Sequence, residues 1–100
     1  MARFDLYRPR RANMGYLVDV QADIVSHLDT RMVVPLFPTD RSPTRASRLN
    51  PVLRVDDVNH ALQTQWMASA PLASLGRPIG SVRDYRDEIT GALDFLLTGF

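Results

Sequence analysis

The chain has 100 residues, of which 12 are basic, 11 are acidic and two are His, and its formal net charge is +1. All the basic residues are Arg and Cys is absent, which excludes a lysine Schiff base, a disulfide framework, a thiolate nucleophile and a cysteine zinc site. The near-zero net charge predicts a surface of mixed sign, unlike the single-sign field of a protein that binds nucleic acid by itself. The length predicts one domain over residues 1–100, because the chain is too short for a second core.

The beginning of the sequence lacks the pattern of a signal peptide. Residues 1–5 alternate polar and apolar side chains where a signal peptide needs a continuous apolar stretch. No run approaches the roughly 18 apolar residues of a membrane span. We therefore expect a soluble, cytoplasmic protein that has no membrane partner.

Two segments near the start alternate with the period of a β-strand. The first is Phe4–Tyr7, and turn-forming residues follow it from Pro9 to Gly15. The second is Tyr16–Gln21, in which alternate residues form two faces: Tyr16, Val18 and Val20 on one, and Leu17, Asp19 and Gln21 on the other. We expect the face with the aromatic and β-branched side chains to be buried.

The segment Arg31–Leu36 predicts a further strand, with Met32, Val34 and Leu36 facing inward. Because Pro35 has no N–H to donate to a ladder, we expect it at a sheet edge or a strand end. Residues 37–51 contain several Pro and scattered Arg, and they predict an exposed loop.

The middle of the chain predicts a hairpin. Val52–Val55 is followed by the acidic pair Asp56 and Asp57, which we place in the turn, and the returning strand extends toward Gln65. The apolar segment Trp66–Pro71 predicts another short strand. Several short strands on short loops favour an antiparallel sheet over alternating βαβ units.

The last part of the chain changes to a helical period. Its apolar residues recur at helical spacing, namely Val82, Tyr85, Ile89, Ala92, Leu93 and Leu96, and Ser81 is a favourable N-cap. Gly91 in the helix interior costs about 0.5–1 kcal/mol relative to Ala, so we expect another group to pack closely against it. Gly99 is expected to end the helix. The sequence therefore predicts a mainly β, α+β fold with one C-terminal helix.

The side chains able to carry chemistry form no metal or nucleophile motif. His27 and His60 do not share the spacing that places two imidazoles on one helix face, so we expect no metal or cofactor and a solvated or singly hydrogen-bonded role for each. A metal-independent ribonuclease is an alternative, because Asp19, Asp23 and Arg31 converge if the strands predicted over residues 16–21 and 31–36 pair. An Asp–Arg pair across neighbouring strands is, however, usually solvated and contributes about a few tenths of a kcal/mol.

Four blocks of the sequence resemble the CcdB toxin family in order and spacing. They are residues 18–25 (Val-Asp-Val-Gln-Ala-Asp-Ile-Val), 30–36 (Thr-Arg-Met-Val-Val-Pro-Leu), 67–71 (Met-Ala-Ser-Ala-Pro) and 92–100 (Ala-Leu-Asp-Phe-Leu-Leu-Thr-Gly-Phe). The resemblance implies an SH3-like antiparallel barrel with a C-terminal helix, assembled as a homodimer. It also implies a non-enzymatic toxin of a type II toxin–antitoxin system, which binds the A subunit of DNA gyrase and traps the gyrase–DNA cleavage complex. A cognate CcdA-like antitoxin would neutralise this toxin and repress the operon with it, so that operator DNA is reached only through the antitoxin.

The same resemblance assigns six residues to gyrase contact: Ile24, Val25, Asp94, Thr98, Gly99 and Phe100. Asp94 stands where the family pattern has Asn, and an ionised carboxylate can only accept hydrogen bonds. Thr98 stands where the pattern has Trp, whose contact area Thr cannot replace. Two interpretations follow: the chain engages gyrase through different contacts, or it is a non-toxic homologue that keeps only antitoxin binding and co-repression.

The homodimer that the resemblance implies would use apolar and small residues from two segments. The candidates for its seam are Met67, Ala68, Ser69, Ala70, Leu96 and Leu97, with ordinary monomer core as the alternative. Trp66 and Met67 are of residue types that are enriched at interfaces and are also ordinary core residues, and both interpretations stay open.

Overall fold

A computed structural model describes residues 2–8, 15–41 and 46–99 of the chain. The strands are β1 (Asp5–Tyr7), β2 (Tyr16–Asp19), β3 (Thr30–Pro38), β4 (Val52–Val55), β5 (Val58–Leu62), β6 (Ala68–Pro71) and β7 (Gly80–Ser81). The α-helix α1 (Arg86–Thr98) follows them. Short 3-10 turns join these elements: η1 (Asp23–Val25), η2 (Thr39–Arg41), η3 (Thr64–Trp66), η4 (Leu72–Ser74) and η5 (Arg83–Tyr85).

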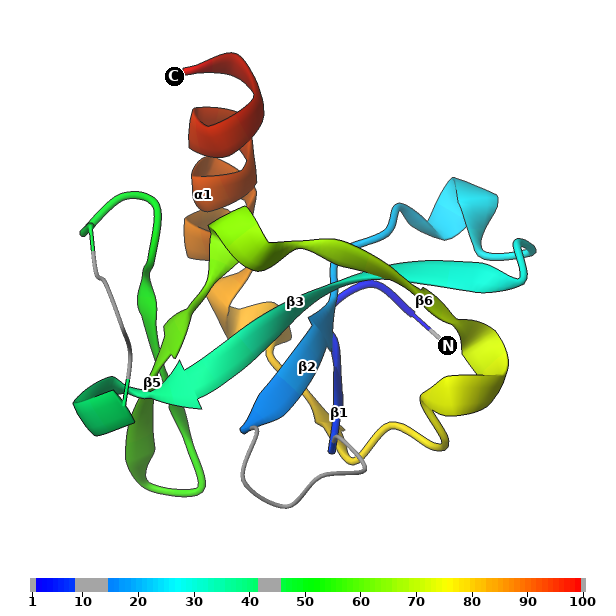
Figure 1. Ribbon diagram of the computed structural model, residues 1–100, viewed down its shortest axis with the longest axis horizontal. Coiled ribbons are helices and arrows are strands. Elements are labelled where there is room, and N and C mark those ends of the chain that lie inside the picture. The colour runs from blue at the N-terminus through cyan, green and yellow to red at the C-terminus, as the bar shows by residue number, and fades with distance from the viewer. Residues whose placement is uncertain (1, 9–14, 42–45, 100) are drawn as a thin grey trace.

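The strands form one antiparallel sheet in the order β4-β5-β3-β2-β1-β7, and β6 pairs with the first half of β3. The sheet is strongly curled into a half-barrel, and α1 stands against it with its C-terminal end projecting away (Figure 1). Consecutive strands pair in three cases, β1 with β2, β2 with β3 and β4 with β5, and these and the remaining pairs are all antiparallel. The predicted fold class, an α+β SH3-like sheet followed by one helix, is confirmed.

The main core lies between α1 and the curled sheet. Ile89 and Leu93 of α1 pack in one cluster with the side chains that the period-two pattern assigns inward, among them Tyr16, Val18, Val20, Val34 and Leu36. A second cluster, formed by Tyr7, Val33 and Leu75, lies apart from this core. Because Val18 and Val34 belong to the first cluster and Val33 to the second, both faces of the sheet centre are covered.

The hairpin predicted in the middle of the chain is confirmed, although its returning strand β5 ends at Leu62 and does not reach Gln65. β4 and β5 pair with Val55 opposite Val58, which leaves the two acidic residues as the turn. Asp56 and Asp57 have positive φ angles of 51° and 62°, as a two-residue turn of type I′ requires. The Tyr16 hydroxyl donates a hydrogen bond of 2.7 Å to the Asp56 carboxylate, and this bond is the main cause that raises the pKa of Tyr16.

Strand β3 corrects two expectations. Pro35 lies inside the strand, where its carbonyl oxygen accepts from Gln63 N–H at 2.9 Å. Gln63 continues the β5 register opposite Pro35, and in place of the N–H that Pro35 lacks, Trp66 N–H donates to Gln63 O at 2.9 Å. The expected loop at 37–51 also begins later, because β3 continues to Pro38.

Several element boundaries differ from the predicted ones. The strand expected over Trp66–Pro71 begins at Ala68, since residues 64–66 form η3. Ser81 belongs to β7 and is not the helix N-cap; its Oγ accepts from Arg83 N–H, and α1 begins at Arg86. The turn predicted from Pro9 to Gly15 lies outside the described residues except for Gly15.

The two glycines of the last helix behave differently. Gly99 ends α1 in the left-handed conformation, with φ of 81° and its N–H donating to Phe95 O at 3.1 Å, which confirms the predicted stop. At Gly91, which is exposed, a Cβ would meet no atom of the described residues within 4 Å. The expectation of a close neighbour at Gly91 is therefore wrong.

Candidate functional site

The first two residues assigned to gyrase contact lie on η1, the turn between β2 and β3. Ile24 is 86% exposed, more than any other large hydrophobic side chain that the structure describes. Val25 is half-buried. A partner that covered an aliphatic side chain as exposed as Ile24 would gain roughly 1.5–3 kcal/mol from its burial.

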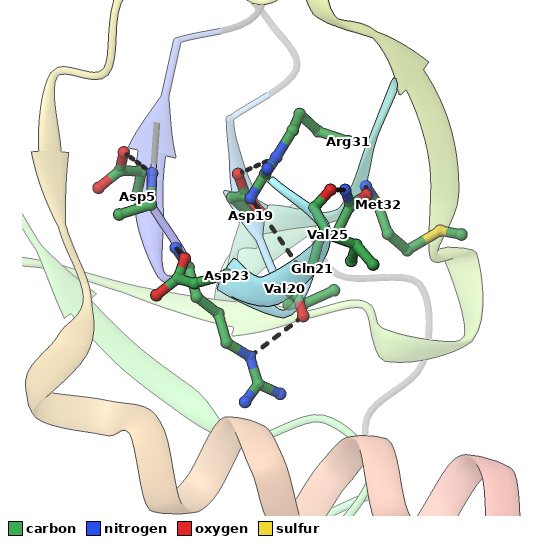
Figure 2. A network of polar contacts seen from close by, with 10 residues as sticks. Asp5, Asp19, Val20, Gln21, Asp23, Val25, Arg31 and Met32 are labelled. Carbon is green, nitrogen blue, oxygen red and sulfur yellow. Dashed lines mark hydrogen bonds and ion pairs between the residues drawn. The ribbon is translucent and has the colours of Figure 1, made fainter. Parts of the chain in front are cut away.

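Polar side chains connect this turn to the strands on either side (Figure 2). The Gln21 side chain donates from Nε2 to Val25 O at 2.9 Å, and its Oε1 accepts from Met32 N–H at 2.9 Å. The Asp23 carboxylate accepts from Arg3 N–H at 2.8 Å. Residues of β3 and of the N-terminal segment therefore both fix the position of η1.

A buried ion pair lies next to these contacts. Arg31 donates from Nε and Nη2 to the two carboxylate oxygens of Asp19 at 2.7 and 3.0 Å, and both side chains are 0% exposed. Asp19 Oδ1 also accepts from Gln21 N–H at 3.0 Å. Asp19 pairs in register with Val33, so the ion pair is diagonal across β2 and β3, within reach of the long Arg side chain.

The burial of this pair corrects the expectation of a solvated cross-strand contact. The face of the sheet that carries Asp19 and Arg31 is the one covered by Tyr7, Val33 and Leu75. The hydrogen bond to Asp19 raises the pKa of the Arg31 guanidinium, and burial followed by the charges of Asp19 and Asp5 raises the pKa of Tyr7 to about 12. Within the described residues, Tyr7 Oη and Arg31 Nη1 are buried without a hydrogen-bond partner.

The second group of assigned residues lies at the end of α1. Asp94 and Thr98 are exposed, and the Thr98 hydroxyl donates to Asp94 O at 2.6 Å, one helical turn earlier. Gly99 follows as the helix stop, and Phe100 lies outside the described residues. η1 and the end of α1 form two separate projections of the molecule (Figure 1).

The residues assigned to the dimer seam come from adjoining elements. Met67 packs against the main core, whereas Ala68 and Ser69 are exposed and Ala70 is half-buried against the second cluster. η3, which directly precedes Met67, contacts α1, where Leu96 and Leu97 are exposed. Trp66 is 47% exposed, with its ring edge against Phe37 at 5.8 Å between centroids. Trp66 is thus a surface residue and Met67 a partly buried one.

The two histidines lie apart from these groups. His60 is buried with its ring 5.2 Å from that of Tyr16, and its Nδ1 lies 2.9 Å from Val58 O, while His27 is exposed. No three His, Asp or Glu side chains in the described part of the chain gather closely enough to hold a metal ion. Across residues 2–8, 15–41 and 46–99, no helix has both the length and the apolar character needed to cross a membrane.

The arrangement of an SH3-like half-barrel with an exposed turn and an exposed helix end agrees with a comparison of the sequence with protein families. The model of the CcdB protein family matches residues 3–99, from the N-terminal segment to the helix stop. The chain belongs to the CcdB family. Members of this family are toxins of toxin–antitoxin systems and act as protein poisons.

The CcdB fold of this chain does not offer Asp19, Asp23 and Arg31 to a substrate as a set. Asp19 and Arg31 are fully buried and bonded to each other, and only Asp23 is exposed. General acid–base catalysis needs groups within hydrogen-bond reach of the reacting atoms. The geometry therefore argues against the ribonuclease alternative.

Two residues that hold η1 in place are not predicted from the sequence, namely Gln21 and Arg3. Gln21 falls on the polar face of its strand pattern, and nothing in the period shows that its side chain bridges Val25 and Met32. Arg3 is one of 12 Arg, and its backbone N–H is the group that bonds Asp23. In the sequence, Gln21 is distinguished only by its position between a predicted strand and Ile24. A polar residue at such a position is too common to predict hydrogen bonds to both Val25 and Met32.

Proposed function

We propose that this CcdB family member is a gyrase poison: it binds the A subunit of DNA gyrase, traps the cleavage complex, and is neutralised by a cognate CcdA-like antitoxin. The observation that carries the proposal is Ile24, an isoleucine held 86% exposed at the position that the resemblance assigns to gyrase contact. An exposed isoleucine contributes little to the stability of the free protein, but its burial against a partner would contribute favourably to binding. The proposal needs no catalytic residue, because the toxin acts by binding.

Asp94 and Thr98, the departures from the family pattern at the end of α1, are expected to weaken the binding contribution of the helix end. Thr98 offers less contact area than Trp, and its hydroxyl is already bonded to Asp94 O. We therefore infer that η1 supplies a larger share of the binding energy in this chain than the helix end does. Co-repression of the operon is proposed to occur with the antitoxin, through which the toxin would reach operator DNA.

A plasmid assay tests the proposal. Purified protein added to gyrase, ATP and supercoiled plasmid should give linear DNA after denaturation, and omission of gyrase should abolish it. Ile24→Ala should weaken gyrase binding at least about tenfold, since three buried carbons are lost. Ile79→Ala is the matched control, because it truncates another isoleucine, 48% exposed, outside the assigned residues.

Other outcomes of these measurements distinguish the alternatives. Antitoxin binding without any gyrase binding at micromolar concentration would overturn the gyrase proposal in favour of the non-toxic homologue. Cleavage of RNA by the purified protein, with gyrase untouched, would favour the ribonuclease.

We also propose that the chain forms a homodimer through β6 and the adjoining part of α1. Trp66 and Leu97, which are 47% and 67% exposed, provide apolar surface near this segment. A symmetric dimer would present two η1 turns and two helix ends to a two-fold-symmetric enzyme. Sedimentation equilibrium should show a dimer, and Ser69→Arg should shift it to monomer; a wild-type monomer at all concentrations would refute this assembly.

A further inference from the structure

We propose that Gln21, together with Arg3 and Asp23, positions η1 so that Ile24 is already in its binding conformation before gyrase arrives. The inference rests on the proposed function, and it assigns these residues no contact with gyrase. Gln21 is a positioning residue that acts through Val25, the neighbour of Ile24.

The turn itself has few means of holding its shape. None of the three residues of η1 is buried, so no core contact anchors it. Its local backbone bonds are Val25 N–H to Ala22 O at 3.1 Å, Ser26 N–H to Asp23 O at 3.0 Å and Leu28 N–H to Val25 O at 3.2 Å. A turn of this length does not supply the cooperative bonding of a longer helix. Its order must therefore come from contacts with the rest of the molecule.

Gln21 supplies such a contact at the C-terminal end of η1. Its amide bridges two elements, since one end donates to Val25 O and the other accepts from Met32 N–H of β3. Its own backbone N–H is held by Asp19 Oδ1, and Asp19 is held by the buried Arg31. The conformation of the exposed turn is thus connected by successive hydrogen bonds to a fully buried ion pair (Figure 2).

Arg3 supplies the contact at the N-terminal end of η1. Its backbone N–H donates to the Asp23 carboxylate at 2.8 Å, and its guanidinium Nε donates to Val20 O at 3.1 Å. The guanidinium also lies 4.9 Å from the Phe4 ring centroid. Both ends of η1 are therefore fixed by residues outside it, while Ile24 between them points to solvent.

Fixing η1 in the free protein should reduce the free-energy cost of ordering this turn when gyrase binds. A partner that binds a disordered loop loses part of the contact energy to ordering it, and a loop held in its bound conformation avoids that loss. The contacts of Gln21 and Asp23 should therefore raise gyrase affinity without adding contact area.

Gln21→Met is the variant that tests this role, because it keeps the length of the side chain and removes both hydrogen bonds. Affinity for the gyrase A subunit, measured by titration calorimetry, should fall about tenfold. Amide exchange at Ser26 and Leu28 should accelerate in the free protein, as expected for a turn released from its anchor. Gln21→Glu, which keeps the acceptor for Met32 N–H and loses the donor to Val25 O, should show the same change.

Val55→Ala is the control for a general loss of stability. Val55 is a core residue of the edge strand β4, which β5 separates from β3, and its truncation should leave the turn contacts intact. It should lower the midpoint of urea unfolding while leaving gyrase affinity and the exchange of Ser26 unchanged. An affinity loss in Val55→Ala equal to that in Gln21→Met would overturn the positioning role.

Combining Gln21→Met with Ile24→Ala shows whether Gln21 acts through Ile24. If it does, Gln21→Met should weaken binding by less than about twofold in the Ile24→Ala background, since the side chain to be positioned is gone. A full, additive loss of about tenfold in the double variant would overturn the inference. Asp23→Ala, an exposed substitution that should leave the fold intact, gives the same test from the other end of η1 if Gln21→Met does not fold.

The binding measurements distinguish failure of the proposed function from failure of the positioning role of Gln21. No gyrase binding by the unchanged protein would overturn the proposed function and with it the positioning role. Binding by the unchanged protein, with equal affinity in Gln21→Met, would overturn the positioning role alone.

Discussion

The η1 turn and the end of α1 both carry residues that we propose to contact gyrase, but different kinds of interaction hold them in place. The turn is fixed by tertiary hydrogen bonds from Arg3 and Gln21, next to a buried ion pair. The helix end is fixed locally, by the Thr98 hydroxyl on Asp94 O and by Gly99 in the left-handed conformation.

This difference predicts which substitutions would disturb more than one part of the molecule. A change in the buried pair disturbs the sheet and the turn together, because Asp19 bonds both Arg31 and the Gln21 backbone. A change at Asp94 or Thr98 leaves the sheet untouched, because both side chains are exposed. Asp94 and Thr98, which the resemblance identifies as departures from the CcdB pattern, both lie in this locally held region.

Asp19→Asn should cause the largest loss of stability. It leaves the buried Arg31 guanidinium without its carboxylate partner, and breaking a buried pair in this way costs about 3–5 kcal/mol. Urea unfolding measures this loss directly. Asp94→Asn is the matched substitution at the exposed helix end and should change stability by less than about 0.5 kcal/mol. Equal effects of the two would mean that the regions are not held differently.

Alkaline pH should weaken the buried region through Tyr7. Burial and the nearby carboxylates raise the pKa of its hydroxyl from 10.0 to about 12 in the folded protein. The unfolded chain therefore loses this proton first as pH rises, so stability is complete below about pH 10 and falls toward about pH 12, by about 2–3 kcal/mol in total. Free energies of unfolding across this range should fall less steeply in Tyr7→Phe. Parallel slopes for the two proteins would contradict the assignment to Tyr7.

Some features of the fold follow from local sequence rules. The alternation in residues 16–20 identifies the side chains that face α1, and the Asp56–Asp57 pair between two apolar runs identifies the hairpin turn. In both cases the prediction needs only a residue and its near neighbours in the sequence. The assignment of Ile24 to gyrase contact, by contrast, follows only from the family resemblance.

The buried Asp19–Arg31 pair does not follow from such rules. Period-two alternation places both residues on the face opposite the main core, where polar side chains usually meet solvent. That face is covered by Leu75 from the segment after β6, a segment with no period of its own. The break between β5 and β6 that accommodates Pro35 is likewise a property of strand pairing, which one strand's sequence does not contain.

Gly99→Ala should affect the helix end alone. Alanine in a left-handed conformation costs about 1 kcal/mol, and among residues 2–8, 15–41 and 46–99 no atom lies within 4 Å of the added Cβ to cause a clash. The last turn of α1 should fray, and gyrase affinity should fall while amide exchange in η1 stays unchanged. Gly76→Ala is the matched control, since Gly76 has a similar φ of 69° and equally open surroundings. Equal gyrase affinity in the two variants would remove the helix end from the proposed contact surface.

Gly91→Ala should have the smallest effect, and the opposite sign. Gly91 lies inside α1 on an exposed face, beside a pocket lined by Arg48 and Glu88, and a Cβ there meets nothing within 4 Å in the part of the chain that the structure describes. Alanine should therefore raise the free energy of unfolding by about 0.5–1 kcal/mol, through backbone entropy alone. Because the helix end depends on the helix before it, this gain should also slow exchange in the last turn of α1 and leave η1 unchanged. A loss of stability would show that another group does occupy this face, and that the helix end is held by more than its local sequence.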